Sequence, residues 1–140
     1  MPLANLQQLA AAKHLKAEKA DRKEFDGLVK LGRARLGDAR RTELSPEGRF
    51  DLAYNAAHAF ALAALRRVGY RSENRYLVFQ CLAHTLDIAP EHWRVLALAH
   101  DRRNAAEYSG VFQHDERLLA DVIRVAELVL AKVEETGPPK

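Results

Sequence analysis

The sequence predicts an all-α fold, an up-and-down bundle of four to five long helices with a short helix at the N-terminus. Apolar residues recur at three- and four-residue steps along nearly all of the chain, which is the period of helices that pack on one face. No segment shows the strict alternation of apolar and polar residues that is typical of a half-buried strand. Helices that follow one another through short loops bury such faces together, so the pattern predicts a bundle.

Two helices are predicted in the N-terminal part. The first is short and covers residues 4–12. The second begins after Asp21, which fits an N-cap because Glu24 follows three residues later, the spacing of a capping box. From Phe25 to Ala39 the apolar positions then continue at helical steps.

The third predicted helix has the clearest start in the chain. Ser45 fits its N-cap, and Pro46 fits the first helical position, where the missing N–H costs nothing. The segment from Phe50 to Val68 is so rich in Ala, Leu and Phe that we expect it to be buried on most sides. We therefore predict that it is the central helix and that Gly69 ends it.

The second half of the chain contains the remaining helices. One of about 14 residues is predicted to open at Ser72 and to close before Pro90, because the residue ahead of a proline disfavours the helical conformation. The next covers about residues 91–108 and ends at Gly110, and the last covers about residues 115–135. In the last helix the apolar residues step by three and four in turn, which is the stripe of a bundle helix.

Length and composition fit one globular domain. The chain has 140 residues, so we expect a single domain over residues 1–135 and a frayed tail over residues 136–140. The one cysteine, Cys81, excludes an intramolecular disulfide. The N-terminus lacks the regions of a signal peptide, and no apolar run is long enough to span a bilayer. We expect a soluble, cytoplasmic protein without a membrane partner.

The net charge of +3 is spread unevenly along the chain. Residues 13–44 carry ten basic against six acidic side chains, residues 66–75 carry four against one, and residues 115–135 carry three against six. Such asymmetry permits a polyanionic partner. The alternative is that these runs are only the solvated faces of helices.

Motifs for metals and cofactors are missing from the sequence. No pair among the six histidines has the spacing of a helical zinc motif, and a single cysteine removes thiolate clusters. The sequence also lacks a glycine-rich phosphate loop and a nucleophile elbow. We therefore predict no metal site and no cofactor.

The end of the helix predicted before Gly110 is an unusual polar island. His100, Asn104 and Tyr108 follow one another at four-residue steps and share one helix face. Arg103 and Glu107 form a neighbouring pair of opposite charge. A salt-bridged helix end that faces water would explain this pattern without any function.

A second polar set interrupts the otherwise apolar third helix. Asp51, Asn55 and His58 project from one side of it. Buried polar groups need partners, and the polar island is a possible source of them. The alternative is that this side faces water, with His58 as a satisfied core residue. If the two faces meet, Arg, Asn, Tyr and His side chains converge in a pocket that suits phosphate or nucleotide chemistry.

An Arg-Asn-x-x-x-(His or Tyr) run at the end of a bundle helix resembles the HEPN (higher eukaryotes and prokaryotes nucleotide-binding) superfamily. In this chain the run begins at Arg103 and ends at Tyr108. The third-helix segment 49–58 and the turn Gly69-Tyr70-Arg71 add to the resemblance, which covers residues 20–135. It implies a bundle of four to five helices that often dimerises across the motif-bearing helices. It also implies association with RNA, frequently in toxin–antitoxin or defence systems.

The resemblance further implies roles for single residues. In active members the arginine positions the scissile phosphate, and a histidine four to six residues later does the acid–base work of metal-independent RNA cleavage. Arg103 matches that arginine, Asn104 matches the polar residue after it, and Tyr108 stands at the position of the histidine. A phenol with a pKa of about 10 is a poor general base at neutral pH, so the resemblance favours binding over cleavage.

Three functions follow as hypotheses. The first is a homodimeric HEPN-like domain that binds RNA or a nucleotide through Arg102, Arg103, Asn104 and Tyr108, aided by Asn55 and His58. The second is a metal-independent ribonuclease toxin, with Arg103, Tyr108 and His58 as catalytic candidates. The third is a protein–protein module, such as the cognate subunit of a toxin–antitoxin pair, which uses the motif only to hold a dimer together.

Overall fold

The computed structural model describes the backbone of residues 2–140 and the side chains of residues 4–140, so Met1 of the predicted domain lies outside the described residues. Helices dominate this range, which confirms the all-α prediction. The elements in chain order are α1 (Pro2–Ala11), β1 (Lys16–Ala17), α2 (Arg22–Ala39), α3 (Pro46–Arg67), β2 (Tyr70–Arg71), α4 (Arg75–Gln80), α5 (Leu82–Thr85), α6 (Pro90–Ser109) and α7 (Glu116–Thr136).

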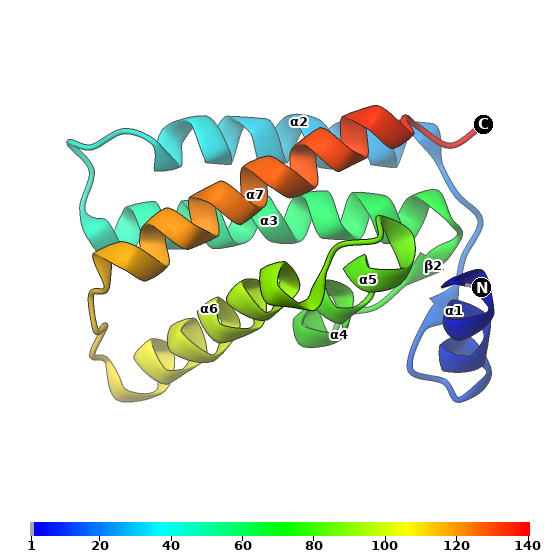
Figure 1. Ribbon diagram of the computed structural model, residues 1–140, viewed down its shortest axis with the longest axis horizontal. Coiled ribbons are helices and arrows are strands. Elements are labelled where there is room, and N and C mark those ends of the chain that lie inside the picture. Colours follow the sequence, from blue (N-terminus) through cyan, green and yellow to red (C-terminus); the bar gives the residue numbers. More distant parts are fainter. Residues whose placement is uncertain (1) are drawn as a thin grey trace.

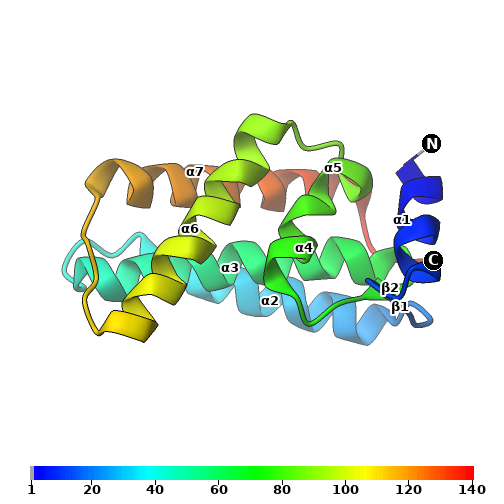
Figure 2. The same ribbon diagram turned by 90° about the horizontal axis from the view of Figure 1, so that it is seen from below.

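The long helices α2, α3, α6 and α7 form the bundle, and successive members run in opposite directions (Figure 1). This arrangement confirms the up-and-down prediction. α3 lies at the centre, with α2 and α7 packed along it and α4, α5 and α6 on a further side (Figures 1 and 2). The short α1 lies at the end of the bundle where α3 finishes and contacts α5.

The alanine-rich sequence of α3 explains its central place. Gly32 of α2 has no side chain and so leaves room for the Phe60 ring of α3; a Cβ atom at Gly32 would stand 2.3 Å from Cε1 of Phe60. Tyr54, Phe60 and Leu65 of α3 are fully buried. The buried Cys81 lies in the same core, where burial raises the pKa of its thiol to about 11. The other helices therefore pack closely around the buried helix α3, and this packing fixes their positions.

Most of the predicted helix ends are confirmed. The hydroxyl of Ser45 accepts a hydrogen bond from the Gly48 amide at 3.0 Å, and Pro46 is the first residue of α3. The Asp115 carboxylate caps α7 in the same way by accepting from the Leu118 amide. Gly110 follows α6 with a φ of 74°, the left-handed conformation that commonly ends a helix.

The predicted capping box at the start of α2 is only half correct. Asp21 is the N-cap and accepts from the Lys23 amide at 2.9 Å. The carboxylate of Glu24 instead accepts hydrogen bonds from Arg66, at 2.5 Å from its Nε, and from Arg71. Two guanidinium groups bind this carboxylate more strongly than one backbone amide would, so a tertiary contact replaces the local one.

The helix predicted from Ser72 is also different in the structure. The Ser72 hydroxyl accepts from the Asn74 amide, and the Asn74 side chain in turn accepts from the Leu77 amide at 3.1 Å. Asn74 is thus the N-cap, and the helical segment is divided into α4 and α5 at Cys81. Side chains that bond their own backbone replace the first helical turn that the sequence predicts here.

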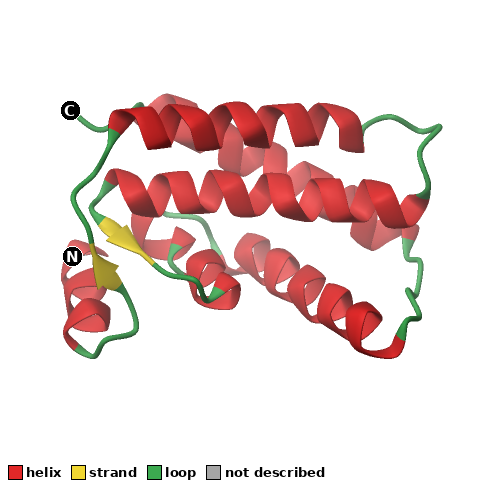
Figure 3. Cartoon of the chain, turned by 180° about the vertical axis from the view of Figure 1, so that it is seen from behind, coloured by secondary structure: helices red, strands yellow, loops and turns green. Residues whose placement is uncertain are grey.

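The short ladder of β1 and β2 was not predicted. It pairs Lys16 with Arg71 and Ala17 with Tyr70 in antiparallel register (Figure 3). Two residues are too few to produce an alternating pattern in the sequence. The ladder joins the segment after α1 to the end of α3, so it is a consequence of tertiary structure.

A buried arginine lies beside this ladder. Arg66 is 1% exposed, and its guanidinium donates to the carbonyls of Glu18 at 2.8 Å and Lys19 at 2.7 Å as well as to the Glu24 carboxylate. Arg71 binds the carboxylates of Glu18 and Glu24. We call Arg66, Arg71, Glu18 and Glu24 the Arg66 cluster. It ties the N-terminal segment to α2 and α3.

The beginning of the C-terminal tail, residues 136–140, is bound to α3. Nε of Arg67 donates to the carbonyl of Gly137 at 2.9 Å, within the tail that the sequence predicts to be frayed. None of the described helices combines the length and the apolar composition that crossing a membrane requires.

Candidate arginine and histidine cluster between α3 and α6

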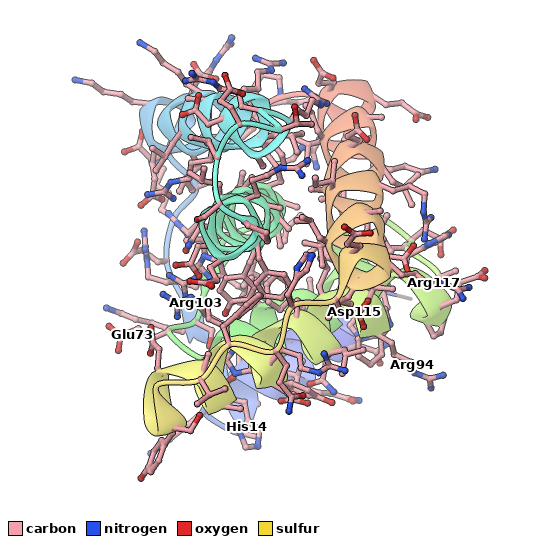
Figure 4. The ribbon with its side chains drawn as sticks, turned by 90° about the vertical axis from the view of Figure 1, so that its left-hand side faces the viewer. His14, Glu73, Arg94, Arg103, Asp115 and Arg117 are labelled. Atoms are coloured by element: carbon pink, nitrogen blue, oxygen red, sulfur yellow. The ribbon has the colours of Figure 1, made fainter. Side chains whose placement is uncertain are left out.

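The two polar faces predicted from the sequence meet in the structure. Asp51 of α3 accepts from Nε of Arg103 of α6 at 3.1 Å. Arg103 lies between α3 and α6, on the side of α3 that is turned away from α7 (Figure 4). We call the residues gathered there the α3–α6 cluster; its members are Asp51, Tyr54, Asn55, His58, Arg75, His100, Arg103 and Asn104.

Tyr54 is the centre of the cluster. Its buried hydroxyl is hydrogen-bonded to Nδ1 of His100 at 2.9 Å, and the two rings are stacked with centroids 6.2 Å apart. The guanidinium carbons of Arg75 and Arg103 lie 5.4 Å and 5.3 Å from the centroid of the same ring. Burial raises the pKa of the Tyr54 hydroxyl even though both arginines oppose this effect, so the hydroxyl stays neutral. The ring thus holds two cations beside a histidine.

Asn55 connects α3 to α4. Its side-chain nitrogen donates to the carbonyl of Asp51 at 2.8 Å, and its side-chain oxygen accepts from Arg75 at 2.8 Å. The short helix α4 brings Arg75 to this place, because Asn74 caps the helix directly before it. The turn at residues 72–74, which the sequence predicts to be helical, therefore positions Arg75.

His58 is neutral at physiological pH. Burial lowers the pKa of its imidazole to about 4, and the positive charges of Arg75 and Arg35 and the nearby His100 act in the same direction. Its ring meets Phe79 edge to face with centroids 5.9 Å apart. His58 is therefore an uncharged aromatic member of the cluster.

His100 is held through both of its ring nitrogens. Nδ1 bonds to the Tyr54 hydroxyl, and Nε2 is 3.1 Å from the side-chain nitrogen of Asn104. The partly exposed Tyr76 of α4 meets the His100 ring with centroids 6.4 Å apart. Asn104 thus fixes the orientation of the histidine, as the four-residue spacing predicts.

Arg103 lies between two carboxylates. Its Nε is 3.1 Å from Asp51, and its Nη2 is 3.2 Å from Glu107 one turn further along α6. A small cavity of about 180 Å³ opens beside it, bordered by Glu47 and Phe112 as well. Both carboxylates face solvent, with 57% and 63% of their side chains exposed. An anion that binds Nε or Nη2 of Arg103 must therefore replace a carboxylate.

Two of the predicted site residues lie outside the cluster. Arg102 points to the other side of α6, where its Nη1 is 3.9 Å from Asp115, which lies on the α7 side in Figure 4. Tyr108 is 98% exposed. The structure therefore brings together Arg103, Asn104, Asn55 and His58, and it places Arg102 and Tyr108 at the edge of the same helix end.

Tyr54 and Arg75 are members of the cluster that the sequence did not predict. Tyr54 looks like a core residue because it lies within an apolar helix, but its position beside Asp51 and Asn55 was a signal. Arg75 is one of four arginines in the basic segment 66–75, for which the sequence leaves open a polyanionic partner or a solvated helix face. Arg66, Arg67 and Arg71 of that segment bind carboxylates or carbonyls of this chain.

A larger cavity of the described residues lies elsewhere. It has a volume of about 530 Å³ and opens between the loop before α3 and the start of α7. Its charged groups are engaged: Arg40 pairs with Glu127, Arg49 donates to the Ala39 carbonyl, and His114 lies 3.8 Å from Glu116. The described residues contain no group of three His, Cys, Asp or Glu side chains that could hold a metal ion. We therefore place the candidate site at the α3–α6 cluster.

Comparison of the chain with models of protein families, with curated proteins and with solved structures found no match in any of the three.

Proposed function

We propose that this chain is a HEPN-like domain that binds single-stranded RNA at the α3–α6 cluster. The observation that carries the proposal is the pair of arginines, Arg75 and Arg103, that flank the Tyr54 ring, with Arg103 on the side of α3 away from α7 (Figure 4). Guanidinium groups bind phosphate through two parallel hydrogen bonds. Aromatic rings such as Tyr76 and His100 offer surfaces on which bases stack. A toxin–antitoxin or defence system is the setting that the family resemblance implies.

The exposed carboxylates make this binding competitive. Asp51 and Glu107 occupy Arg103 when no ligand is bound, and a phosphate group replaces them. Because exposed ion pairs contribute only about 0–1 kcal/mol, the exchange costs little. The exposed ring of Tyr108 serves the same strand at the edge of the site as a stacking surface.

Binding without cleavage fits the cluster best. A general base needs a pKa close to the working pH and a ring nitrogen that faces the substrate. Both nitrogens of His100 are engaged, and burial lowers the pKa of His58 to about 4. Tyr108 stands where the resemblance implies a histidine. We therefore propose an RNA-binding domain in which cleavage is absent.

A homodimer is part of the proposal. Leu31 and Tyr76 are large apolar side chains that are exposed. Tyr76 contacts His100, and Leu31 lies one turn before Arg35, whose charge acts on His58. Exposed apolar residues around a polar cluster are typical of a surface that another protein covers. A second copy on this side would enclose the RNA between two clusters.

RNA binding measured as a function of salt tests the proposal. Arg103→Ala is expected to weaken binding of a single-stranded oligonucleotide roughly 5-fold at 0.1 M salt, because each lost phosphate contact lowers the slope of log K against log salt by about 0.7. Asp51→Asn removes a competitor of the phosphate and is expected to tighten binding. Arg124→Ala, at an exposed position of α7, is the control with the same loss of charge. A mononucleotide in parallel shows whether a strand is required.

The outcomes separate three functions. No binding by the wild-type protein, or equal loss in Arg103→Ala and Arg124→Ala, would contradict RNA recognition. The protein–protein module would then be favoured, because both neighbours of Arg103 are carboxylates of the same chain. The dimer of such a module should dissociate when Tyr108 is changed. Cleavage of RNA in the presence of a chelator, lost in Arg103→Ala, would instead identify a metal-independent ribonuclease.

A further inference from the structure

A second basic pocket lies at the N-terminal end of the molecule, where α1, β1 and β2 come together (Figure 2). Its volume is about 480 Å³. The segment after α1 forms one wall, and the residues from β2 to the start of α4 form the other. Its polar lining consists of Lys13, His14, Lys16, Arg71, Ser72 and Glu73. We call it the N-terminal pocket.

The charges of the N-terminal pocket are mostly positive and only partly neutralised. Arg71 is engaged by the Arg66 cluster. Nζ of Lys16 is 3.8 Å from Glu18, a loose pair that is largely exposed. Lys13 forms no ion pair among the described residues, and Glu73 is the one acidic side chain in the lining. Two ammonium groups and a hydroxyl, that of Ser72, are thus available to an anion.

The backbone at Lys13 is unusual. Its φ of 65° lies in the left-handed region, where glycine is the common residue. The turn is the Schellman type that ends a helix, with the His14 amide donating to the Leu9 carbonyl at 2.9 Å and the Lys13 amide to Ala10 at 3.0 Å. A lysine at this position is strained, and strained residues are concentrated at binding sites. The turn itself favours glycine, so it does not explain the lysine at position 13. A binding role of its ammonium group would explain it.

The N-terminal pocket is connected to the α3–α6 cluster by a short stretch of chain. Arg71 lines the pocket, and Arg75 belongs to the cluster. Four residues span at most about 14 Å even when fully extended. A strand whose first few nucleotides occupy the cluster therefore reaches the pocket with the nucleotides that follow.

We propose that the N-terminal pocket is a second phosphate-binding site, which holds the RNA strand where it leaves the α3–α6 cluster. The inference rests on the proposed function and adds to it a direction for the strand and a minimum length for the ligand. Lys13 and Lys16 would contact phosphodiester groups as point charges, and the Ser72 hydroxyl would donate a hydrogen bond to a phosphate oxygen.

Binding of two oligonucleotides, of about 4 and about 12 nucleotides, tests this inference. The variant is Lys13→Gly combined with Lys16→Ala. Glycine suits the left-handed backbone, so the variant is expected to fold at least as well as the wild-type protein. The matched control is Lys30→Ala combined with Lys140→Ala, because both lysines are exposed and form no ion pair among the described residues.

The expected result depends on length. The double variant should weaken binding of the long oligonucleotide roughly 25-fold at 0.1 M salt and lower its salt slope by about 1.4, since two phosphate contacts are lost. Binding of the short one should not change, whereas Arg103→Ala should weaken both. If the double variant binds the long oligonucleotide as tightly as the control does, the inference is overturned and the proposed function stands. If the wild-type protein binds neither oligonucleotide, the proposed function fails as well.

Discussion

The Arg66 cluster and the α3–α6 cluster are built from the same components in different surroundings. In each, one arginine lies between two carboxylates: Arg66 between Glu18 and Glu24, and Arg103 between Asp51 and Glu107. The side chain of Arg66 is 1% exposed, whereas that of Arg103 is 26% exposed. Arg66 also donates to the backbone carbonyls of Glu18 and Lys19, while Arg103 lies over the ring of Tyr54.

This difference decides what each cluster is suited to do. The partners of Arg66 include backbone carbonyls that hold the N-terminal segment, so exchanging them means opening the fold. The partners of Arg103 are carboxylates at the surface, which rotate away at small cost. An arginine between two acids is therefore a structural element in one place and an exchangeable contact in the other, and burial is the deciding variable.

Removal of the buried guanidinium should have the largest effect. We expect Arg66→Ala to lower the free energy of unfolding by about 3–5 kcal/mol, because it leaves two carbonyls without their donor and leaves the carboxylates of Glu18 and Glu24 with Arg71 as their one guanidinium partner. Urea denaturation measures this change. Arg22→Ala, which removes an exposed pair with Asp26, is the control and should cost about 0.3–0.5 kcal/mol. Similar losses in the two variants would show that the Arg66 cluster is not buried in solution.

Neutralising one acid of the same cluster should have the next largest effect. We expect Glu24→Gln to cost about 1.5–3 kcal/mol at pH 7, since hydrogen bonds to charged groups are worth that much. Burial alone would raise the pKa of the Glu24 carboxyl, but Arg66 and Arg71 outweigh it and lower the pKa below 4.5. The stabilisation is therefore complete above that pH and is lost as the pH falls through the lowered pKa. The difference between variant and wild type should shrink in acid, and a constant difference would contradict this account.

The α3–α6 cluster should respond to acid in a different pH range. The pKa of His58 is about 4 in the folded chain against 6.5 as its ordinary value. Between these values the unfolded chain takes up a proton that the folded chain does not, so stability should fall as the pH is lowered from about 6.5 to about 4. His58→Gln should remove this part of the pH dependence. The free energy of unfolding measured at several pH values in this range tests the prediction, with Glu24→Gln as the control. If it falls with decreasing pH as steeply in His58→Gln as in Glu24→Gln, the prediction is refuted.

Loss of the Tyr54 hydroxyl should have a smaller effect. Tyr54→Phe keeps the ring between Arg75 and Arg103 and removes the hydrogen bond to His100. We expect a loss of about 0.5–1.5 kcal/mol, the usual value of one such bond. Thermal unfolding measures it, and NMR of the His100 ring would show whether the imidazole keeps its orientation. A variant as stable as the wild type would show that this bond does not join α3 to α6.

The smallest effect on stability is expected at the arginine that we propose to bind RNA. Arg103→Ala breaks two exposed ion pairs and should cost at most about 1 kcal/mol. Its measurement by urea denaturation completes the comparison with Arg66→Ala. A loss as large as that of Arg66→Ala would show that Arg103 is a structural residue, and the difference between the two clusters would disappear.

Local signals in the sequence were enough to predict most of the fold. Ser45, Asp115 and Gly110 mark helix ends because their effects involve neighbouring residues only. The four-residue spacing of Asp51 and Asn55, and of His100 and Asn104, placed each pair on one helix face for the same reason. The prediction failed at Glu24 and Ser72, where a distant arginine or an alternative turn competes with the local pattern.

The candidate site was predicted in part. Arg103, Asn104, Asn55 and His58 were identified by spacing and by resemblance, and they lie together. Tyr54 and Arg75 were not identified. The local sequence does not show what an aromatic residue in an apolar helix, or an arginine in a basic run, contacts in the folded chain.

By itself, the sequence determined the helices, their order and the amphipathic faces that must be buried, since these depend on residues three or four positions apart. Only the tertiary structure decided which arginine is enclosed and which is open. Arg66 and Arg75 are nine residues apart in one basic segment. Arg66 is nevertheless buried beside the ladder of β1 and β2, whereas Arg75 lies over Tyr54 at the surface of the bundle. Whether a charged group is buried depends on segments far away in the chain, here residues 16–24 and α6, and no local pattern contains that information.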